Sequence, residues 1–408
     1  MQGCFLNILV MKNRYFSFGL VMLLSVASAF AQGGTTGPLT WNISDSTLTI
    51  SGNGAMPDYS PYDVNEYAPW YEYRTSIKTV VIEDGITSIG FYAFYYCIRM
   101  TSIIIPNSVV IIGNRAFDFC ASLPSITIPN SVTYIGGGAF TYCRDLVSVD
   151  IPNSVTSIGD LAFYFCTSLS SITIPNSVES LGYQAFYFCT SLTSITLSGN
   201  ITSIESGTFF YCTSLTSIII PNSVRRIDYE AFSHCPHLSS VTLPDNLENI
   251  GWCAFYFCFN LTSVTNYNPV PTYIDPSVFH GVLKGDCTLK VPMNSVTNYK
   301  NAEEWKKFNI VGIEETGIVE ADNRLSLHVF PNPTSGELRV TSYELQVTSI
   351  EVYDVMGRMV PPLNPPEGGK LPSFGGVGGG NISHLPNGVY FVRIQTEKGT
   401  VTRKVVKN

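Results

Sequence analysis

The sequence predicts a solenoid of stacked coils with short parallel β-strands, capped at both ends and followed by a separate small β-sandwich. A pattern of 23 residues repeats eight times from Ile82 to Thr265 without insertion or deletion. Each repeat combines an alternating strand pattern with a turn-like segment, so one repeat is expected to form one coil. From Ser326 onwards, alternating strands separated by turn residues replace the repeat and indicate a second fold.

The composition excludes several classes of protein. Hydrophobic residues make up 45% of the 408 residues, which is enough to supply a core and excludes a disordered chain. Only 13% of the residues are charged, and the formal net charge is -8. Phosphate backbones and anionic membrane surfaces repel a negative chain. The sequence therefore argues against nucleic acid as a partner.

Residues 1–31 have the pattern of an export signal. Basic residues beginning at Lys12 precede an apolar run and a small-x-small site that ends at Ala31, so cleavage is expected before Gln32. Translation from Met11 would give the same signal a shorter leader. The alternative is a membrane anchor, but the run is shorter than the ~20 residues that a span needs. No later segment is apolar enough to cross a bilayer, so we expect no transmembrane span in the mature protein.

Equivalent positions of the repeats share one chemistry. The thirteenth position is always Phe, and Ala162 marks a column of small residues. In the repeat that starts at Ile151, the spacing Leu169-x-x-Ile172 predicts a short strand with one buried face. The segment from Ile158 to Cys166 is spaced like a tight helical turn. A single repeat is too small to fold alone, so stability must come from neighbouring coils.

Segments on both sides of the repeats have the patterns expected of caps. Residues 32–81 carry alternating strand patterns and bulky residues such as Trp70, as an N-terminal cap would. Residues 266–312 supply a strand and then a short helix whose Trp305 could close the last coil. Residues 313–325 form a polar linker. Residues 326–408 have the alternating pattern of an immunoglobulin-like β-sandwich, interrupted by an insertion rich in proline and glycine.

The repeat pattern resembles a known family. The pattern IPxxVxxIGxxAFxxCxxLxxI, met in nearly every repeat, is similar to the leucine-rich repeats of the surface-protein A type, also called the Treponema type. The resemblance implies a leucine-rich-repeat solenoid of short parallel β-strands joined by turns, 3-10 segments or short helical segments. It also implies adhesion to host or bacterial surfaces.

The C-terminal segment resembles the type A sorting domain of type IX secretion. The resemblance implies passage through a Bacteroidetes outer membrane by the type IX secretion machinery, removal of the sorting domain, and release or attachment to lipopolysaccharide. The matching residues are Pro331, Asn332, Pro333, Gly336, Gly357, Arg358, Gly388, Tyr390 and Lys404.

The position before the repeated cysteine departs from the family pattern, in which it is small or polar. This column holds Tyr96, Phe119, Tyr142, Phe165, Phe188, Tyr211, His234 and Phe257. The turn that buries the Phe and Cys columns should leave these rings on the rim. Two interpretations remain open: the rings stack on one another or under a neighbouring loop, or they form a platform for sugars or for apolar patches of another protein.

The strand positions predict a second exposed surface. Alternate residues point outward and form a polar, nearly uncharged strip of Ser beside Asp150 and threonines. The strip is either a solvated face with good strand propensity or a ligand surface. The candidate binding residues of this strip are Thr127, Thr173, Thr196 and Thr242.

The cysteine column is expected to be a buried ladder of free thiols. Stacked coils hold equivalent Cβ atoms ~4.8 Å apart, whereas a disulfide needs ~3.8 Å. Disulfides and metal binding are the less favoured alternatives. Cys253 and Cys287 lie outside the column, near the C-terminal cap, and could pair with each other. The ladder comprises Cys97, Cys120, Cys143, Cys166, Cys189, Cys212, Cys235 and Cys258.

Catalytic patterns are absent from the sequence. There is no H-E-x-x-H, G-x-S-x-G or P-loop, and the cluster His234-Cys235-Pro236-His237 matches no zinc-site spacing. The carboxylates Asp150, Glu179 and Asp228 fall in different columns and form no acid–base pair. We therefore predict no enzyme activity, no cofactor and no metal.

These observations predict an exported, cell-surface or secreted recognition protein that binds an extracellular protein or glycan through its solenoid. One alternative is a structural surface protein that associates with itself through the aromatic rims. A second, less favoured alternative is an enzyme of unrecognised type.

Overall fold

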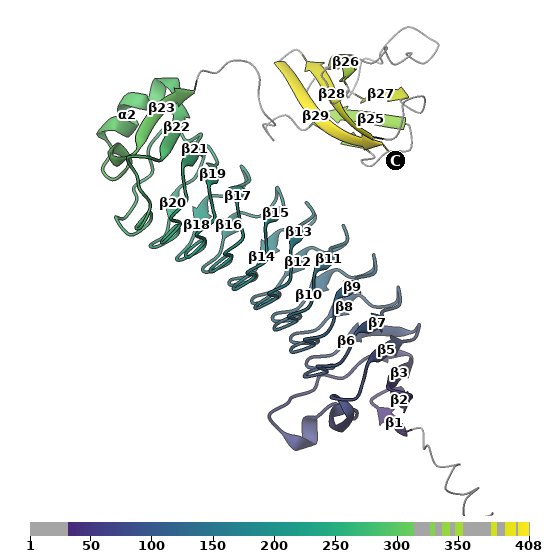
Figure 1. Cartoon of the computed structure of the whole chain (residues 1–408). Helices are drawn as coiled ribbons and strands as arrows, with labels where there is room; N and C mark the ends of the chain where they lie inside the picture. The colour runs from purple at the N-terminus through teal and green to yellow at the C-terminus, as the bar shows by residue number, and fades with distance from the viewer. Residues whose placement is uncertain are drawn as a thin grey trace, which may run out of the picture. The chain divides into compact units, whose positions relative to one another are not determined.

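The computed structural model describes residues 32–313 and six strands beyond them (Figure 1). The described chain divides into two compact units. The first comprises the residues up to 196 together with 205–215, and the second comprises 197–204 together with the residues from 216 onwards. The expected export signal and most of the expected linker lie outside the described residues.

The first unit contains two rows of strands (Figure 1). One row begins with a five-stranded sheet in the order β1 (Gln32–Thr36), β2 (Leu39–Ser44), β3 (Thr47–Gly52), β5 (Thr79–Ile82) and β7 (Ser102–Ile104). It continues as the pairs β9 (Ser125–Thr127) with β11 (Ser148–Asp150), and β13 (Ser171–Thr173) with β15 (Ser194–Thr196). The second row is a six-stranded parallel sheet in the order β14 (Ser180–Leu181), β12 (Ser157–Ile158), β10 (Tyr134–Ile135), β8 (Ile111–Ile112), β6 (Ile86–Ile89) and β4 (Gly54–Ala55). Two 3-10 turns, η1 (Val64–Glu66) and η2 (Tyr71–Tyr73), precede β5.

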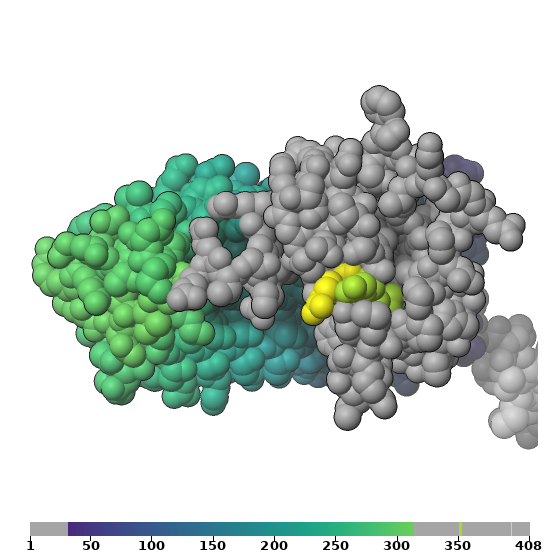
Figure 2. Space-filling view, turned by 90° about the horizontal axis from the view of Figure 1, so that it is seen from above, coloured from purple at the N-terminus to yellow at the C-terminus, as the bar shows by residue number. Residues whose placement is uncertain are grey.

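The second unit repeats this arrangement. Its parallel sheets have the orders β16 (Ser203–Ile204), β18 (Arg226–Ile227), β20 (Asn249–Ile250), and β17 (Ser217–Ile219), β19 (Ser240–Leu243), β21 (Ser263–Asn266), β22 (Thr288–Pro292), β23 (Asn309–Ile313). Between β22 and β23 lie η3 (Met293–Ser295), the helix α2 (Val296–Asn301) and η4 (Trp305–Lys307). In the space-filling view, this green end of the unit is closely packed (Figure 2).

The C-terminal segment is described only as strands. Two antiparallel sheets have the orders β24 (Leu327–Phe330), β25 (Glu337–Ser342), β27 (Val377–Asn381), and β26 (Val347–Tyr353), β28 (Gly388–Thr396), β29 (Gly399–Lys407). Alternating strands were expected here. Their assembly into an immunoglobulin-like sandwich stays a prediction.

The strand register follows the sequence repeat. Ser125 pairs with Ser148, and Ser171 with Ser194, so partners across each parallel pair are one repeat apart. One repeat therefore advances the chain by one strand spacing, which confirms the predicted solenoid. The parallel pairing already begins at β3 and β4, upstream of Ile82.

The core of each unit is built from columns of identical residues. In the first unit, the buried rings from Phe94 to Phe209 stack on one another at centroid distances of 5.3 to 5.6 Å. The ladder cysteines are buried and free, as expected. Six of the ladder thiols donate to the Phe carbonyl of the preceding coil, as Cys166 does to Phe140 at 3.1 Å. The Cys235 thiol lies 4.0 Å from the Ser233 carbonyl. Sulfur thus joins the coils without any disulfide.

Tryptophans lie at the outer ends of the Phe columns. Trp70 stacks on Phe94 at 6.1 Å, and its indole nitrogen donates to the Ala93 carbonyl at 2.7 Å. In the second unit, Phe279 extends the column past Phe255 and meets Trp305 edge-on at 5.7 Å.

The helical turn expected between the strands of each repeat does not form. Within residues 82–265 these segments are turns and contain no helix. Two residues per coil, such as Leu161 and Phe165, have φ near 60°, and a left-handed residue interrupts a right-handed helix. Each coil also contains a second short strand that the sequence did not predict. It has four residues in β6 of the first coil and two residues in the others, such as β12.

Candidate functional site

The strand face of the first unit consists of the outward side chains of β9, β11, β13 and β15. Ile126 and Val149 point into the core, and the residues on either side of each are polar and exposed, so the two strands alternate strictly. Thr127, Thr173 and Thr196 are all exposed, and the register aligns Thr173 beside Thr196. The structure thus places these three candidates on the strand face of the first unit. Thr242 lies in the second unit and is half-buried.

Asp150 occupies the same column as these threonines and is exposed on the strand face. It is the charged residue of that column among β9, β11, β13 and β15, and Lys290 on β22 is a charged residue of the same column in the second unit. The remaining polar groups are hydroxyls, which both donate and accept hydrogen bonds. Such a face suits a ligand with many hydroxyls or a protein edge, and it offers no general acid–base pair.

Sequence reasoning missed two apolar members of this column. Ile104 in the first unit and Ile219 in the second occupy the position where other coils carry Thr or Asp, and both side chains are exposed. Aligning the repeats shows the exchange, so the signal was present in the sequence.

The aromatic stack of the first unit consists of Tyr96, Phe119, Tyr142, Phe165, Phe188 and Tyr211. Successive centroids lie 4.3 to 5.0 Å apart, and the Phe165 and Phe188 rings are parallel within 3°. The four inner rings are half-buried, whereas the end rings Tyr96 and Tyr211 are 38% and 37% exposed. Neighbouring rings therefore cover the inner faces, and ring edges face the solvent.

A second line of rings backs the aromatic stack. Tyr164, Tyr187 and Phe210 stack at 5.1 and 4.6 Å, and Tyr164 also meets Tyr142 edge-on at 5.7 Å. The backbone supports both lines, because the Phe165 amide donates to the Tyr187 carbonyl at 2.8 Å. The rings are therefore held in fixed positions.

The corresponding rings of the second unit are arranged differently. His234 meets Phe257 edge-on at 5.2 Å, and Phe257 is half-buried. Tyr256 stacks on His280 at 5.0 Å. The regular face-to-face order of the first unit is therefore not repeated here.

A buried ion pair lies beside the start of the aromatic stack. The Asp118 side chain is 1% exposed, and its Oδ2 accepts a hydrogen bond from Arg115 Nη1 at 2.8 Å. Burial raises the pKa of Asp118 to about 6, although the Arg115 guanidinium opposes the shift. Burial also raises the pKa of the nearby Tyr92 to about 12. Asp118 is therefore a buried carboxyl that titrates close to neutral pH.

The structure brings no catalytic or metal-binding group together among the residues it describes. No cluster of three His, Cys, Asp or Glu side chains there could hold a metal ion. His234 Nδ1 lies 2.9 Å from the Ser233 hydroxyl, and Cys235 is buried in its ladder position. Asp228 pairs with Arg226 Nε at 2.8 Å.

The expected pairing of Cys253 with Cys287 is wrong in this structure, where both thiols are free. Cys287 is buried directly before β22, and burial raises its pKa to about 12. Cys253 is half-buried on a turn with φ 56°. The two residues therefore belong to different local environments.

The candidate sorting residues are only partly described. Gly388 and Tyr390 lie on β28, and Lys404 lies on β29, where it pairs with Phe391. The other six candidates fall outside the described residues: Pro331, Asn332, Pro333, Gly336, Gly357 and Arg358. In the part of the chain that the structure describes, no helix is long and apolar enough to cross a membrane.

Two known families match the chain. Residues 67–189 and 156–285, together more than half of the chain, match the BspA type Leucine rich repeat region in six copies. Residues 328–408 match the Secretion system C-terminal sorting domain. The chain is therefore handled by type IX secretion and delivered to the cell surface or the extracellular space. No curated protein matches it.

Several solved structures are similar to this chain. A leucine-rich repeat protein from Eubacterium ventriosum is 22% identical, with 69% of this chain and 85% of that chain covered and a TM-score of 0.44. One from Bacteroides ovatus is 27% identical, with 63% and 70% covered and a TM-score of 0.46. A leucine rich cell surface protein from Faecalibacterium prausnitzii is 23% identical, with 71% and 96% covered and a TM-score of 0.38.

Proposed function

The chain belongs to the BspA-type leucine-rich-repeat family, and from this premise we propose that it is an exported recognition protein that adheres to an extracellular protein or glycan through its solenoid. Solenoids typically act as binding scaffolds because stacked repeats form extended surfaces. We assign this chain no catalytic role.

The observation that carries the proposal is the strand face. Its hydroxyls are exposed in aligned columns, and the buried residues between them fix the face to the core. A rigid surface loses little conformational entropy on binding. We propose Thr127, Thr173 and Thr196 as contact residues, with Ile104 as an apolar contact at one end.

The aromatic stack is the second proposed contact. Sugars pack against ring faces, but neighbouring rings cover the inner faces. We propose that the inner ring edges contact an apolar patch of a protein, whereas the end rings Tyr96 and Tyr211 retain a partly exposed ring.

The terminal segments of the solenoid are proposed to act as caps. Trp70 covers Phe94 in the first unit, and Trp305 covers Phe279 in the second. Open coil ends would stack on further molecules. Covered ends favour a soluble adhesin over end-to-end assembly, the structural alternative.

The test compares two matched double variants of the intact protein on immobilised mucin, matrix proteins and a glycan array. T127R/T173R places bulky charge on the strand face, and T133R/T156R places it on equally exposed threonines outside that face. We expect a specific ligand whose binding falls at least tenfold in the first variant alone. Equal binding by both variants, with both folded, would remove the strand face from the proposal.

A further inference from the structure

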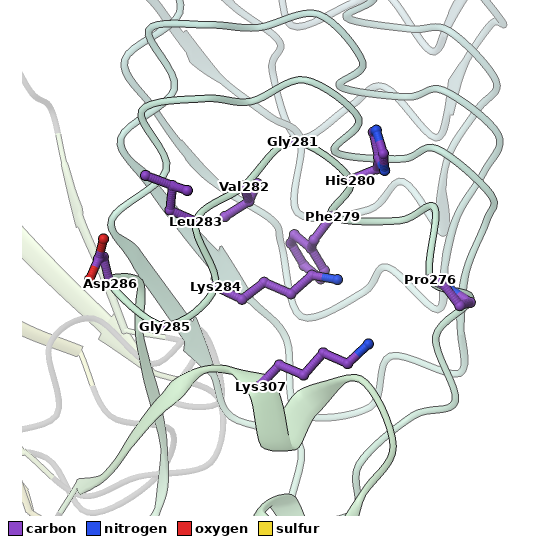
Figure 3. Close-up of a pocket in the computed structure, with 10 residues that line it drawn as sticks. All are labelled: Pro276, Phe279, His280, Gly281, Val282, Leu283, Lys284, Gly285, Asp286 and Lys307. Carbon is purple, nitrogen blue, oxygen red and sulfur yellow. The ribbon is translucent and has the colours of Figure 1, made fainter.

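A hollow of about 430 Å³ lies in the second unit, between the segment that precedes β22 and the 3-10 turn η4 (Figure 3). Residues 276–286, which include the last stacked phenylalanine, supply most of its wall. Lys307, in η4, supplies the rest. Phe279 and Val282 are buried and form its apolar side. Its volume is within the range of small-molecule sites.

Two lysines of the hollow share one carboxylate. Lys284 Nζ lies 2.8 Å from Glu304 Oε2, and Lys307 Nζ contacts the other oxygen of the same carboxylate. The Lys284 and Glu304 side chains are only 16% and 5% exposed, and that of Lys307 is 50% exposed. Hydrogen bonds from Lys284 and Lys307 lower the pKa of Glu304, so the trio carries one excess positive charge.

The ammonium groups retain unused donors. Each has three N–H donors and gives one to Glu304. Among the described residues, neither has a second acceptor. Figure 3 shows both side chains extending toward the same side of the hollow, while Asp286 lies on the opposite side. The excess charge and the unused donors therefore converge on one part of the hollow.

The backbone at Glu304 is strained. Its φ of 67° and ψ of -49°, with the Trp305 amide donating to the Glu303 carbonyl at 2.8 Å, form a γ-turn. Such a conformation costs roughly 1–3 kcal/mol and persists only where the surroundings fix it. Here Trp305 is buried, and its indole donates to the Thr272 carbonyl at 2.7 Å. The carboxylate that positions both lysines is thus rigidly held.

An aromatic ring lies at the rim of the hollow. His280 lines the hollow and stacks on Tyr256 at 5.0 Å with an interplanar angle of 14°. Figure 3 shows the His280 ring at the rim of the hollow, apart from the ammonium ends of Lys284 and Lys307. A flat ring at the rim and two ammonium donors within the hollow suit a ligand that has both a ring and an acidic group. Acidic sugars have this combination.

We propose that this hollow binds a carboxylate-bearing sugar, such as a hexuronate unit of an acidic polysaccharide. The sugar carboxylate accepts hydrogen bonds from Lys284 and Lys307, and the sugar ring lies beside His280. This site is separate from the strand face and does not depend on the proposed function.

The test is calorimetric titration of the intact protein with trigalacturonate and with its methyl ester, which keeps the rings and removes the charge. We expect trigalacturonate to bind at least tenfold more tightly than the ester. K307Q should weaken binding tenfold or more, and K307R should retain it. K306Q is the matched control, because Lys306 lies in the same 3-10 turn and does not line the hollow.

Three outcomes would overturn the proposal. The ester binding as tightly as the acid would remove the carboxylate from recognition. An equal loss of binding in K306Q and K307Q, with unchanged thermal unfolding, would show that binding depends only on the overall positive charge of this region. Binding of heparin-derived trisaccharides after selective removal of their carboxyl groups, without binding of trigalacturonate, would assign the site to sulfate.

Discussion

Each ladder cysteine is a polar link inside an apolar column. The Cys166 thiol donates to the Phe140 carbonyl of the preceding coil and is completely buried. Burial raises the pKa of Cys166 well above its ordinary value. A protonated, inaccessible thiol is a poor nucleophile, which explains how a regular ladder can remain reduced in an exported protein.

We therefore expect selective labelling of the folded protein by iodoacetamide at pH 8. Cys253 should react because it is half-buried and lies outside the ladder, whereas the ladder thiols should stay unmodified until denaturant is added. Peptide mass spectrometry would measure the modified fraction at each site. Rapid labelling of Cys166 in the folded state would contradict the buried ladder.

Asp118 should make stability depend on pH. Its pKa is about 6 in the folded state against 3.8 for the ordinary carboxyl, so the folded protein binds more protons between these values. The free energy of unfolding therefore falls as pH rises from about 4 to about 6, by roughly 2–3 kcal/mol for this group. Below about pH 4 the stabilisation by protonated Asp118 is fully present.

The free energy of unfolding of the variant D118N should lack the pH dependence that Asp118 contributes. At pH 7 the variant should be at least as stable as the wild type. Arg115 is 36% exposed, so its guanidinium can turn to water. Urea unfolding at several pH values would measure the difference between the two curves. The exposed Asp145 supplies the control D145N, which removes one negative charge at a site that is not buried. A flat difference for D118N would show that Asp118 does not titrate in this window.

At the scale of the coil, left-handed residues shape the turns. Leu161 has φ 60°. Two other coils carry glycine at the equivalent position, Gly138 with φ 64° and Gly207 with φ 61°. A left-handed conformation costs a residue with a side chain about 1–2 kcal/mol, whereas glycine adopts it freely. The repeat imposes this conformation even where the sequence does not supply glycine.

L161G should therefore raise the free energy of unfolding by up to about 1 kcal/mol, because relief of strain exceeds the loss of one half-buried side chain. The hydrogen bonds of Leu161 use its backbone and are kept. A162G, at the next residue, is the matched control and should destabilise the protein, because Ala162 is buried and has no positive φ. Thermal unfolding would compare both variants, and a lower melting temperature for L161G would refute the strain argument.

The coils could be predicted from the sequence because residues paired across neighbouring strands are one repeat apart. Ser148 pairs with Ser125 one repeat earlier, so the aligned sequence already contains the strand neighbours. The turns could not, because aromatic residues are poor left-handed formers. Phe165 adopts φ 57° only because its ring stacks on Phe188 and its amide bonds to the next coil. Both contacts are tertiary.

The same limit applies to the candidate sites. The outward threonines follow from strand alternation, so Thr173 was predictable. The hollow was not, because Lys284 and Glu304 are twenty residues apart and meet only through a strained turn. No local pattern in the sequence encodes that meeting.

At the scale of the whole molecule, the residues that form the solenoid and the residues that direct export lie in different parts of the chain. The repeat match covers residues 67–189 and 156–285, whereas the sorting match covers 328–408. The two matches share no residue. Removal of the sorting region should therefore change where the protein goes and leave the solenoid folded.

We expect a chain that ends at residue 325 to remain on the inner side of the outer membrane of the producing cell. The intact chain should reach the cell surface or the medium. The export signal expected in residues 1–31 is unchanged, so the first membrane should still be crossed. Cell fractionation with immunoblotting would measure the distribution, and T173A in the intact chain controls for a change in the solenoid alone. The truncated protein should keep the thermal unfolding of its solenoid. If it reached the medium as efficiently as the intact chain, residues 328–408 would not be the sorting signal of this protein.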